Sequence, residues 1–240
     1  MKQFWLYGKH TCISALKNKN RLCYELLLSP TFYKQNYKEL RDYIEAKNVK
    51  VIETNKFNTI LASHVNHQGI ALKVAPLKNF ELQEIIEKST NKSTVLILDQ
   101  ITDTYNIGSI LRTSACFGMD ALILTYKHSP CENASIAKAA SGTLEITPLL
   151  YVTNIVKTIK LLKEQGYWCY GLDCHASQNL DSISKFYDKR IIIVGSEDKG
   201  LRRLVKENCD FLIKIPISPN IDSLNVSNAA AIVLYSIYNK

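Results

Sequence analysis

Residues 94–112 read Thr94-Val-Leu-Ile-Leu-Asp99-Gln-Ile-Thr-Asp103-Thr-Tyr-Asn106-Ile-Gly108-Ser-Ile-Leu-Arg112, and they decide the fold class. The apolar run over 95–98 is typical of a strand buried inside a sheet. A helix is predicted after Asn106, a good N-cap residue, with Gly118 at its end. A buried strand that leads directly into a helix is the building unit of an α/β fold.

The same alternation of strand and helix continues to the end of the chain. Residues 154–165 form a predicted amphipathic helix, because Ile155, Ile159 and Leu162 share one face and Gly166 follows them. Residues 223–238 are rich in alanine and apolar side chains, which predicts a buried helix. Further strands are predicted over 121–124, 167–172, 191–194 and 211–215. This pattern predicts an α/β domain with a mostly parallel sheet and helices on both faces.

A smaller α/β unit is predicted before this domain. Its strands are expected over 26–28, 49–52 and 70–74, and its helices over 10–17, 37–46 and 55–62. A polar, charged stretch with a short helix over 81–87 separates the two parts. We therefore predict one domain over 1–75, a linker over 76–92 and a second domain over 93–240.

The composition restricts the class of protein. The chain has 240 residues, which corresponds to one or two domains. With 46% hydrophobic and 22% charged residues, it is neither a disordered nor a collagen-like chain. No apolar run approaches the roughly 18 residues of a membrane span, and residues 1–10 contain no secretory hydrophobic region. Seven cysteines without a Cys-x-x-Cys pair favour a reducing, cytoplasmic location.

Positive charge is concentrated in the first third of the chain. Residues 1–75 carry 12 basic and 5 acidic side chains, a net charge of +7, whereas residues 93–240 carry 15 and 14, a net charge of +1. A basic module beside a nearly neutral body suggests a polyanionic partner, most often a nucleic acid. A solvated basic surface explains the same charge, so charge alone does not decide between the two.

Common nucleotide-binding motifs are absent: the chain contains neither Gly-x-Gly-x-x-Gly nor a P-loop. Instead, glycines and unusual polar residues are expected where strands of the second domain end, which is where α/β sheets bind ligands. The first such loop contains Asn106, Gly108 and Arg112. Taken alone, it is explained better by a capped helix whose Arg112 pairs with Asp99 or Asp103 than by a functional site.

The second and third loops each carry a weak signal alone, and the order and spacing of the three loops together make a strong one. The second, Gly195-Ser-Glu197-Asp-Lys-Gly200-Leu, sets a carboxylate between two glycines directly after an apolar strand, and Gly200 is expected at a helix start. In the third, over 215–227, Ser223 is a candidate N-cap for the last helix. Asn225 is then a poor helix former inside the first turn, without a local reason to be there. Polar residues of this kind ahead of an apolar helix indicate a site.

Together the three loops resemble the three signature motifs of the SpoU (TrmH) family of RNA ribose 2′-O-methyltransferases, in the SPOUT superfamily. The segment Ala140-Ser141-Gly142 between them fits the same family. The first unit resembles a ribosomal-protein-L30e-like substrate-binding domain, through Tyr7-Gly8-Lys9-His10 and His67-Gln68-Gly69-Ile70. Two positions depart from the family motifs, Thr104 and Pro219, and both lie outside the expected catalytic positions.

The resemblance implies a parallel sheet with a C-terminal trefoil knot, S-adenosylmethionine as cofactor, an rRNA substrate, a homodimer formed through the last helix, and no metal ion. The residues that it implies fall into three groups. Those expected in catalysis are Arg112, Asn106, Glu197, Ser223 and Asn225. Those expected to contact the cofactor are Gly195, Ile215, Leu224 and Gly200. Those expected to contact RNA are His67, Gln68, Gly69 and Lys9.

The implied reaction is methylation of the ribose 2′-hydroxyl of a guanosine in large-subunit (23S) rRNA. In the family, the arginine that matches Arg112 of this sequence is proposed to activate the hydroxyl. Because an arginine side chain has a reference pKa of about 12.5–13.8, we favour Arg112 as a phosphate clamp that stabilises the developing alkoxide. Asn106 and Glu197 are expected to hold Arg112. The alternatives are a tRNA methyltransferase of the same family and a non-catalytic RNA-binding assembly factor, which would be expected to lack Arg112 or Glu197.

Overall fold

The computed structural model describes residues 3–46, 48–61, 65–183 and 185–239. The chain folds into two compact units: Met1–Lys78 with Glu132–Glu145, and Asn79–Cys131 with Ile146–Lys240. The chain therefore passes between the units three times. The segment Glu132–Glu145, which includes Ala140-Ser141-Gly142, belongs to the first unit although the residues on either side of it belong to the second.

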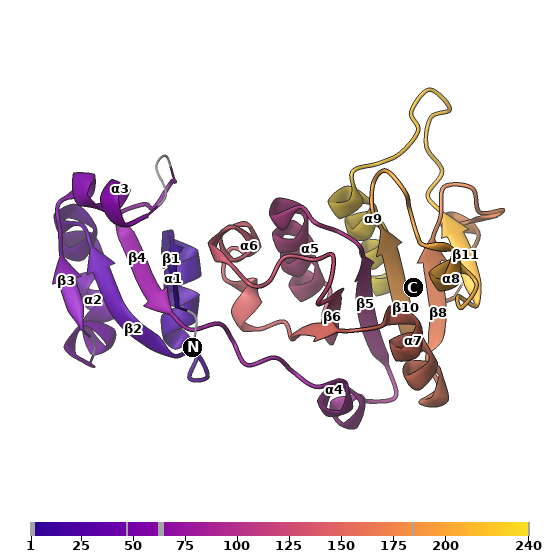
Figure 1. Ribbon diagram of the computed structural model, residues 1–240, viewed down its shortest axis with the longest axis horizontal. Helices are drawn as coiled ribbons and strands as arrows, with labels where there is room; N and C mark the ends of the chain where they lie inside the picture. The colour runs from indigo at the N-terminus through magenta and orange to yellow at the C-terminus, as the bar shows by residue number, and fades with distance from the viewer. Residues whose placement is uncertain (1–2, 47, 62–64, 184, 240) are drawn as a thin grey trace. The chain divides into compact units, whose positions relative to one another are not determined.

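The first unit contains a four-stranded sheet in the order β1-β4-β2-β3 (Figure 1). The pairs β1–β4 and β2–β4 are antiparallel, and β2–β3 is parallel. Its strands are β1 (Phe4–Tyr7), β2 (Cys23–Leu28), β3 (Val49–Val51) and β4 (Ile70–Val74). Its helices are α1 (Lys9–Lys17), α2 (Pro30–Ala46), α3 (Phe57–Ile60) and α6 (Ala134–Ala140), with short 3₁₀ turns η1 (Thr54–Lys56) and η2 (Thr143–Glu145).

Three predictions in this unit need correction. Strand β1 was not predicted, because only one of its four residues is buried. Helix α2 begins at Pro30 rather than at residue 37, since proline suits the first position of a helix. The helix predicted over 55–62 is the 3₁₀ turn η1 followed by α3, and its predicted last residue, Ala62, lies outside the described residues.

The second unit contains a seven-stranded sheet in the order β7-β6-β5-β10-β8-β11-β9, and all its strand pairs are parallel, as predicted. The strands are β5 (Ser93–Asp99), β6 (Ala121–Thr125), β7 (Leu149–Val152), β8 (Trp168–Leu172), β9 (Gln178–Asn179), β10 (Lys189–Gly195) and β11 (Phe211–Lys214). In the central pair, Gly195 at the end of β10 is in register with Asp99 at the end of β5. This register brings the loops that follow both strands to one edge of the sheet.

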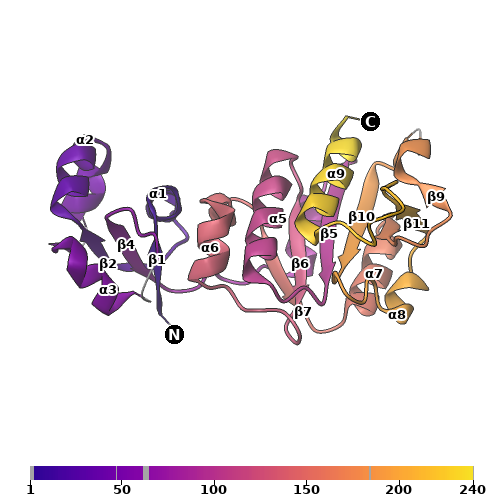
Figure 2. The same ribbon diagram turned by 90° about the horizontal axis from the view of Figure 1, so that it is seen from above.

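Helices cover both faces of this sheet, and alternate strand residues face them (Figure 2). Val95, Ile97, Ile191 and Ile193 pack in one core with α4 (Leu82–Lys88), α7 (Ile155–Glu164) and α8 (Arg203–Lys206). Helices α5 (Thr104–Cys116) and α9 (Val226–Tyr238) pack against each other, and α9 also packs on β10. The sheet thus holds the start of both α5 and α9 near the strand ends.

The structure changes the predicted helix starts. Asp103, not Asn106, caps α5, because its side chain accepts a hydrogen bond from the Tyr105 N–H. Asn225, not Ser223, caps α9 by accepting from the Ser227 N–H. Gly108 is buried inside α5 rather than at a strand end. Asn106 is consequently not used as a cap, and its side chain remains available for a longer-range contact.

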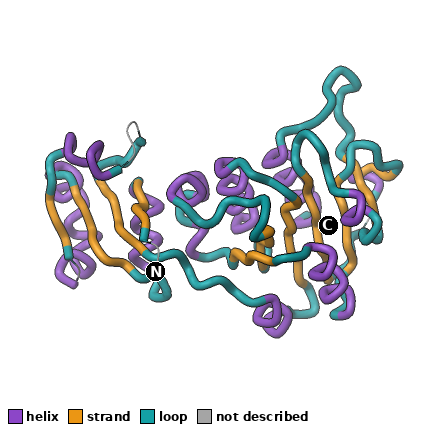
Figure 3. Tube along the Cα trace, viewed as in Figure 1, coloured by secondary structure: helices purple, strands orange, loops and turns teal. Residues whose placement is uncertain are grey.

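Residues 215–225, between β11 and α9, form one long loop without helix or strand (Figure 3). This is the third loop singled out in the sequence, and it returns the chain from β11 to the start of α9. The trefoil knot stays a prediction. Within the described ranges, no helix combines the length and apolarity needed to span a membrane.

Candidate active site

The loop after β10 makes a tight reversal that presents Glu197. Gly200 has a φ of +61° and donates its N–H to the Ser196 carbonyl at 2.8 Å. A side chain at Gly195 is excluded, because a Cβ there would lie 2.2 Å from the Gly200 carbonyl carbon. Gly200 was expected at a helix start, but α8 begins only at Arg203. Both glycines therefore serve the turn that projects the carboxylate between them.

Glu197 joins all three loops through one oxygen. Its Oε1 accepts hydrogen bonds from the Asn225 Nδ2 at 2.7 Å, the Asn106 Nδ2 at 3.2 Å and the Val226 N–H at 3.2 Å. The Asn225 Nδ2 also lies 3.0 Å from the Asn106 Oδ1. Because Val226 is the first residue of α9, the carboxylate lies at the positive end of that helix. The structure thus brings together Asn106, Glu197 and Asn225, which are far apart in the sequence.

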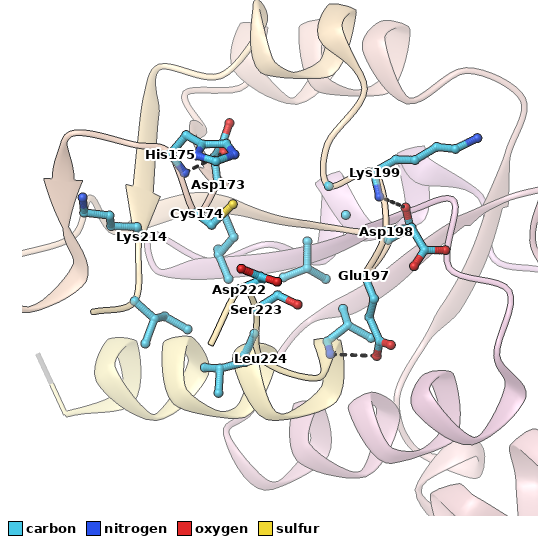
Figure 4. Close-up of a pocket in the computed structure, with 18 of the residues that line it drawn as sticks. Asp173, Cys174, His175, Glu197, Asp198, Lys199, Lys214, Asp222, Ser223 and Leu224 are labelled. Carbon is cyan, nitrogen blue, oxygen red and sulfur yellow. Dashed lines mark hydrogen bonds between the residues drawn. The ribbon is translucent and has the colours of Figure 1, made fainter. Parts of the chain in front are cut away.

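A cavity of about 470 Å³ adjoins this cluster (Figure 4). Its volume is in the range of small-molecule sites. All four residues predicted to contact a cofactor line it, together with Glu197 and Ser223 from the catalytic set. These cofactor residues are Gly195, Gly200, Ile215 and Leu224.

Sequence reasoning missed one wall of the cavity, the loop Asp173-Cys174-His175 after β8. Asp173 is nearly buried and pairs with the Lys206 Nζ at 2.5 Å, and its Oδ1 accepts the His175 N–H at 3.0 Å. Burial alone would raise the pKa of the Asp173 carboxyl, but the contacts with Lys206 and His175 outweigh it and lower that pKa. The missed signal was a polar run at another strand end, the same rule that found the other loops.

Arg112 does not join the cluster. It lies on α5 with an exposed side chain, and no hydrogen bond or ion pair links it to another described residue. The prediction that Asn106 and Glu197 hold Arg112 therefore finds no contact in the structure. Pairing of Arg112 with Asp99 or Asp103, the alternative from the sequence, is not found either. Asp99 accepts a hydrogen bond from the Arg202 Nε at 2.7 Å, and Asp103 caps α5. The Arg112 guanidinium thus remains available to an external anion.

The residues predicted to bind RNA gather in the first unit. The Gln68 Oε1 accepts the Lys9 N–H at 3.0 Å, and the His67 Nδ1 accepts the Gly69 N–H at 3.0 Å. The His67 ring stacks on Phe57 with 4.3 Å between ring centroids. Gly69 has a φ of +78°, and a Cβ there would lie 2.5 Å from the Ser29 Oγ. The left-handed backbone and the close Ser29 side chain therefore favour glycine at this position, which is a structural reason for Gly69.

The cavity suits a cofactor such as S-adenosylmethionine by the chemistry of its lining. Ile215, Ile217 and Leu224 provide apolar surface for an aromatic ring, and Asp173 and Asp222 provide carboxylates for hydroxyl or ammonium groups. In the part of the chain that the structure describes, no group of three or more His, Cys, Asp or Glu side chains is placed to hold a metal ion.

Comparison with known families agrees with this geometry. Residues 93–235 match the SpoU rRNA Methylase family, and residues 5–80 match the RNA 2′-O ribose methyltransferase substrate binding family. The chain belongs to the SpoU rRNA methylase family. It is therefore an RNA methyltransferase, which confirms the predicted family and enzyme class and leaves the non-catalytic alternative without support.

Individual relatives give the same result. TrmH family tRNA/rRNA methyltransferases of Staphylococcus saprophyticus and Staphylococcus epidermidis are 33% and 32% identical to this chain, over 100% of it and 97% of each relative. The SpoU methyltransferase AviRb of Streptomyces viridochromogenes, crystallised with AdoMet, superposes with a TM-score of 0.83 at 18% identity, over 99% of this chain and 89% of that chain. An AdoMet-bound rRNA methyltransferase of Sinorhizobium meliloti also superposes with a TM-score of 0.83, at 20% identity, over 99% of this chain and 87% of that chain. These structures confirm the predicted α/β fold.

Proposed function

We propose that this protein transfers a methyl group from S-adenosylmethionine to the ribose 2′-hydroxyl of a guanosine in large-subunit rRNA. The observation that carries the proposal is the hydrogen-bonded cluster of Asn106, Glu197 and Asn225 beside the 470 Å³ cavity. It draws one residue from each of the three loops into a single arrangement.

The cofactor would be held by the loops that line the cavity. Leu224 and Ile215 would contact it through apolar surface, and Gly195, whose lack of a side chain lets the Gly200 backbone pack against it, also lines the cavity. The bound cofactor supplies an electrophilic methyl group. Glu197, by binding both the Asn225 side chain and the Val226 N–H, fixes the end of the loop that carries Ser223 and Leu224.

Arg112 would act on the substrate. Its exposed guanidinium, without an ion-pair partner among the described residues, suits a phosphate next to the target ribose. A positive charge there also stabilises the alkoxide that develops on the 2′-oxygen. Because arginine keeps its proton at neutral pH, we assign the proton to a substrate phosphate oxygen rather than to Arg112.

Two observations support rRNA as the substrate. The substrate-binding family match covers residues 5–80, the basic part of the chain. The Sinorhizobium meliloti rRNA methyltransferase matches 99% of this chain, whereas a protein whose structure concerns 2-OH methylation of C/U34 on tRNA matches 62% of it. A tRNA substrate is the second candidate, because the Staphylococcus relatives carry both tRNA and rRNA in their names.

We also propose that the enzyme is a homodimer formed through α9, in the cytoplasm. One face of α9 is buried in its own unit through residues such as Ala230 and Leu234. The opposite side leaves Ile232, Tyr235 and Tyr238 exposed, and Tyr235 is 61% exposed. Large apolar side chains gathered on an exposed helix face favour a protein partner.

The proposal is tested by supplying methyl-labelled S-adenosylmethionine with separate unmodified rRNA and tRNA. Label should enter large-subunit rRNA, and the modified linkage should resist alkaline hydrolysis because a methylated 2′-oxygen cannot attack the adjacent phosphate. Label confined to tRNA would favour the second candidate. Label in a linkage that alkali still cleaves would exclude ribose methylation.

A further inference from the structure

The segment Glu132–Glu145 packs in the first unit although it lies inside the residues matched to the methylase family. Its helix α6 packs on β1, and the Ala137 carbonyl accepts a hydrogen bond from the Thr11 Oγ1 at 3.3 Å. At Gly142 a Cβ would lie 2.3 Å from the Ser14 Oγ. These close contacts make the segment an integral part of the first unit.

A buried ion cluster fixes both ends of the segment. The Arg21 side chain is 0% exposed, and it lies 2.5 Å from the Glu132 Oε1 through Nη1 and 2.5 Å from the Glu145 Oε1 through Nη2. Glu132 also accepts the Leu77 N–H at 2.8 Å, and Glu145 accepts the Asn18 Nδ2 at 2.7 Å. Removing Arg21 would leave two buried carboxylates without their cation, and removing either carboxylate would detach one end of the segment from Arg21, so the position of the segment is strongly specified.

The fixed segment brings Lys138 to the residues predicted to bind RNA. The Lys138 Nζ lies 3.2 Å from the Gln68 Oε1, the same oxygen that accepts the Lys9 N–H. It also lies 5.9 Å from the centroid of the Tyr7 ring. A Cβ at Gly8 would lie 2.3 Å from this Nζ, so glycine there leaves room for the ammonium group.

The charge of Lys138 is not neutralised by protein. The described residues place no carboxylate oxygen within ion-pair distance of its Nζ, whereas the Lys9 Nζ has Glu39 at 3.9 Å. The Lys138 side chain is half-buried, and this burial lowers the pKa of its ammonium group. A partly dehydrated, uncompensated ammonium group beside an RNA-binding surface is suited to a phosphate oxygen.

We propose that Lys138 contacts an RNA phosphate, and that the RNA-binding surface of the first unit combines Lys9 and Gln68 with this lysine from the segment Glu132–Glu145. The inference rests on the proposed role of the first unit in RNA binding. It assigns part of the substrate site to residues that sequence similarity alone places in the methyltransferase domain.

The test compares single-lysine variants of the full chain for binding to a large-subunit rRNA fragment across a range of salt concentrations. A plot of log affinity against log salt falls with increasing salt, and in Lys138→Gln the magnitude of this slope should be lower by about 0.9, the value for one phosphate contact on a duplex. The affinity for S-adenosylmethionine should stay unchanged. Lys138→Arg should keep the wild-type slope, which separates loss of charge from misfolding. Lys160→Gln, at an exposed position of α7 in the second unit, is the control for net charge and should leave the slope unchanged.

The outcomes separate the inference from the proposed function. If Lys9→Gln lowers the slope and Lys138→Gln does not, the composite surface is refuted and RNA binding by the first unit stands. If neither variant changes the slope although the wild-type protein binds the fragment, the composite surface and the role of the first unit in RNA binding are both refuted. A lower slope in both Lys138→Gln and Lys138→Arg would indicate disruption of the fold and would also overturn the assignment of a phosphate contact.

Discussion

Replacement of Glu197 by alanine tests the hydrogen-bonded cluster directly. The substitution removes the acceptor of three hydrogen bonds, to Asn106, Asn225 and the Val226 N–H. Each such bond contributes about 0.5–1.5 kcal/mol net, and the favourable contact with the start of α9 adds about 0.3–1 kcal/mol. Since Glu197 is exposed, water replaces part of these contacts in the variant. We expect Glu197→Ala to lose about 2 kcal/mol of the free energy that holds the three loops together.

This loss should appear in cofactor binding, because the loop that Glu197 fixes carries Ser223 and Leu224 into the cavity. A change of about 2 kcal/mol corresponds to roughly 30-fold weaker binding of S-adenosylmethionine, measured by isothermal titration calorimetry. Glu197→Gln keeps a neutral acceptor and should lose less, about 1 kcal/mol or fivefold.

The matched control is Glu164→Ala, an exposed carboxylate at the end of α7 that does not line the cavity. It should bind the cofactor like the wild-type protein. If Glu197→Ala also binds within twofold of wild type, the cluster does not organise the cofactor loop and our reasoning about its role is wrong.

Three further predictions concern other parts of the second unit. Arg112→Ala should slow methyl transfer about 10²–10³-fold and leave cofactor affinity near wild type, since Arg112 does not line the cavity; an unchanged rate would remove it from the mechanism. Sedimentation equilibrium should show a dimer that Tyr235→Glu dissociates, and a wild-type monomer that is fully active would refute the dimer. Because the pKa of Asp173 is lowered in the folded state, its pairing stabilises the protein above pH about 4 and is lost as pH falls through that lowered value. The destabilisation caused by Lys206→Met, measured by urea unfolding, should therefore shrink in acid, and a pH-independent loss would contradict this.

The fold of the second unit was predictable because its central strands, β5, β6 and β10, are almost entirely buried. Every residue of β5 is buried, so its apolar run stands out in the sequence, and α7 buries Ile155, Ile159 and Leu162 as its periodicity predicts. Strand β9 has only two residues, and β1 is mostly half-buried, so neither leaves a pattern that a sequence can show.

The sequence singled out several residues that line the cavity, but it did not show how they connect. The sequence suggested Asn106 and Ser223 as the caps of the two helices, whereas Asp103 caps α5 and Asn225 caps α9. The choice between them depends on Glu197, which is 91 residues from Asn106 and enters only when the strand ends meet. Similarly, no local pattern predicts that Lys138 packs beside Gln68, because a non-local ion cluster around Arg21 fixes its segment.

The central claim is that this chain methylates the ribose of one guanosine in large-subunit rRNA. The most direct measurement is a map of 2′-O-methylation, at nucleotide resolution, in rRNA and tRNA from cells that lack the protein. We expect one guanosine of large-subunit rRNA to lose its 2′-O-methyl group, and to regain it with the wild-type protein but not with Arg112→Ala. An unchanged rRNA map, or a loss confined to tRNA, would contradict the claim.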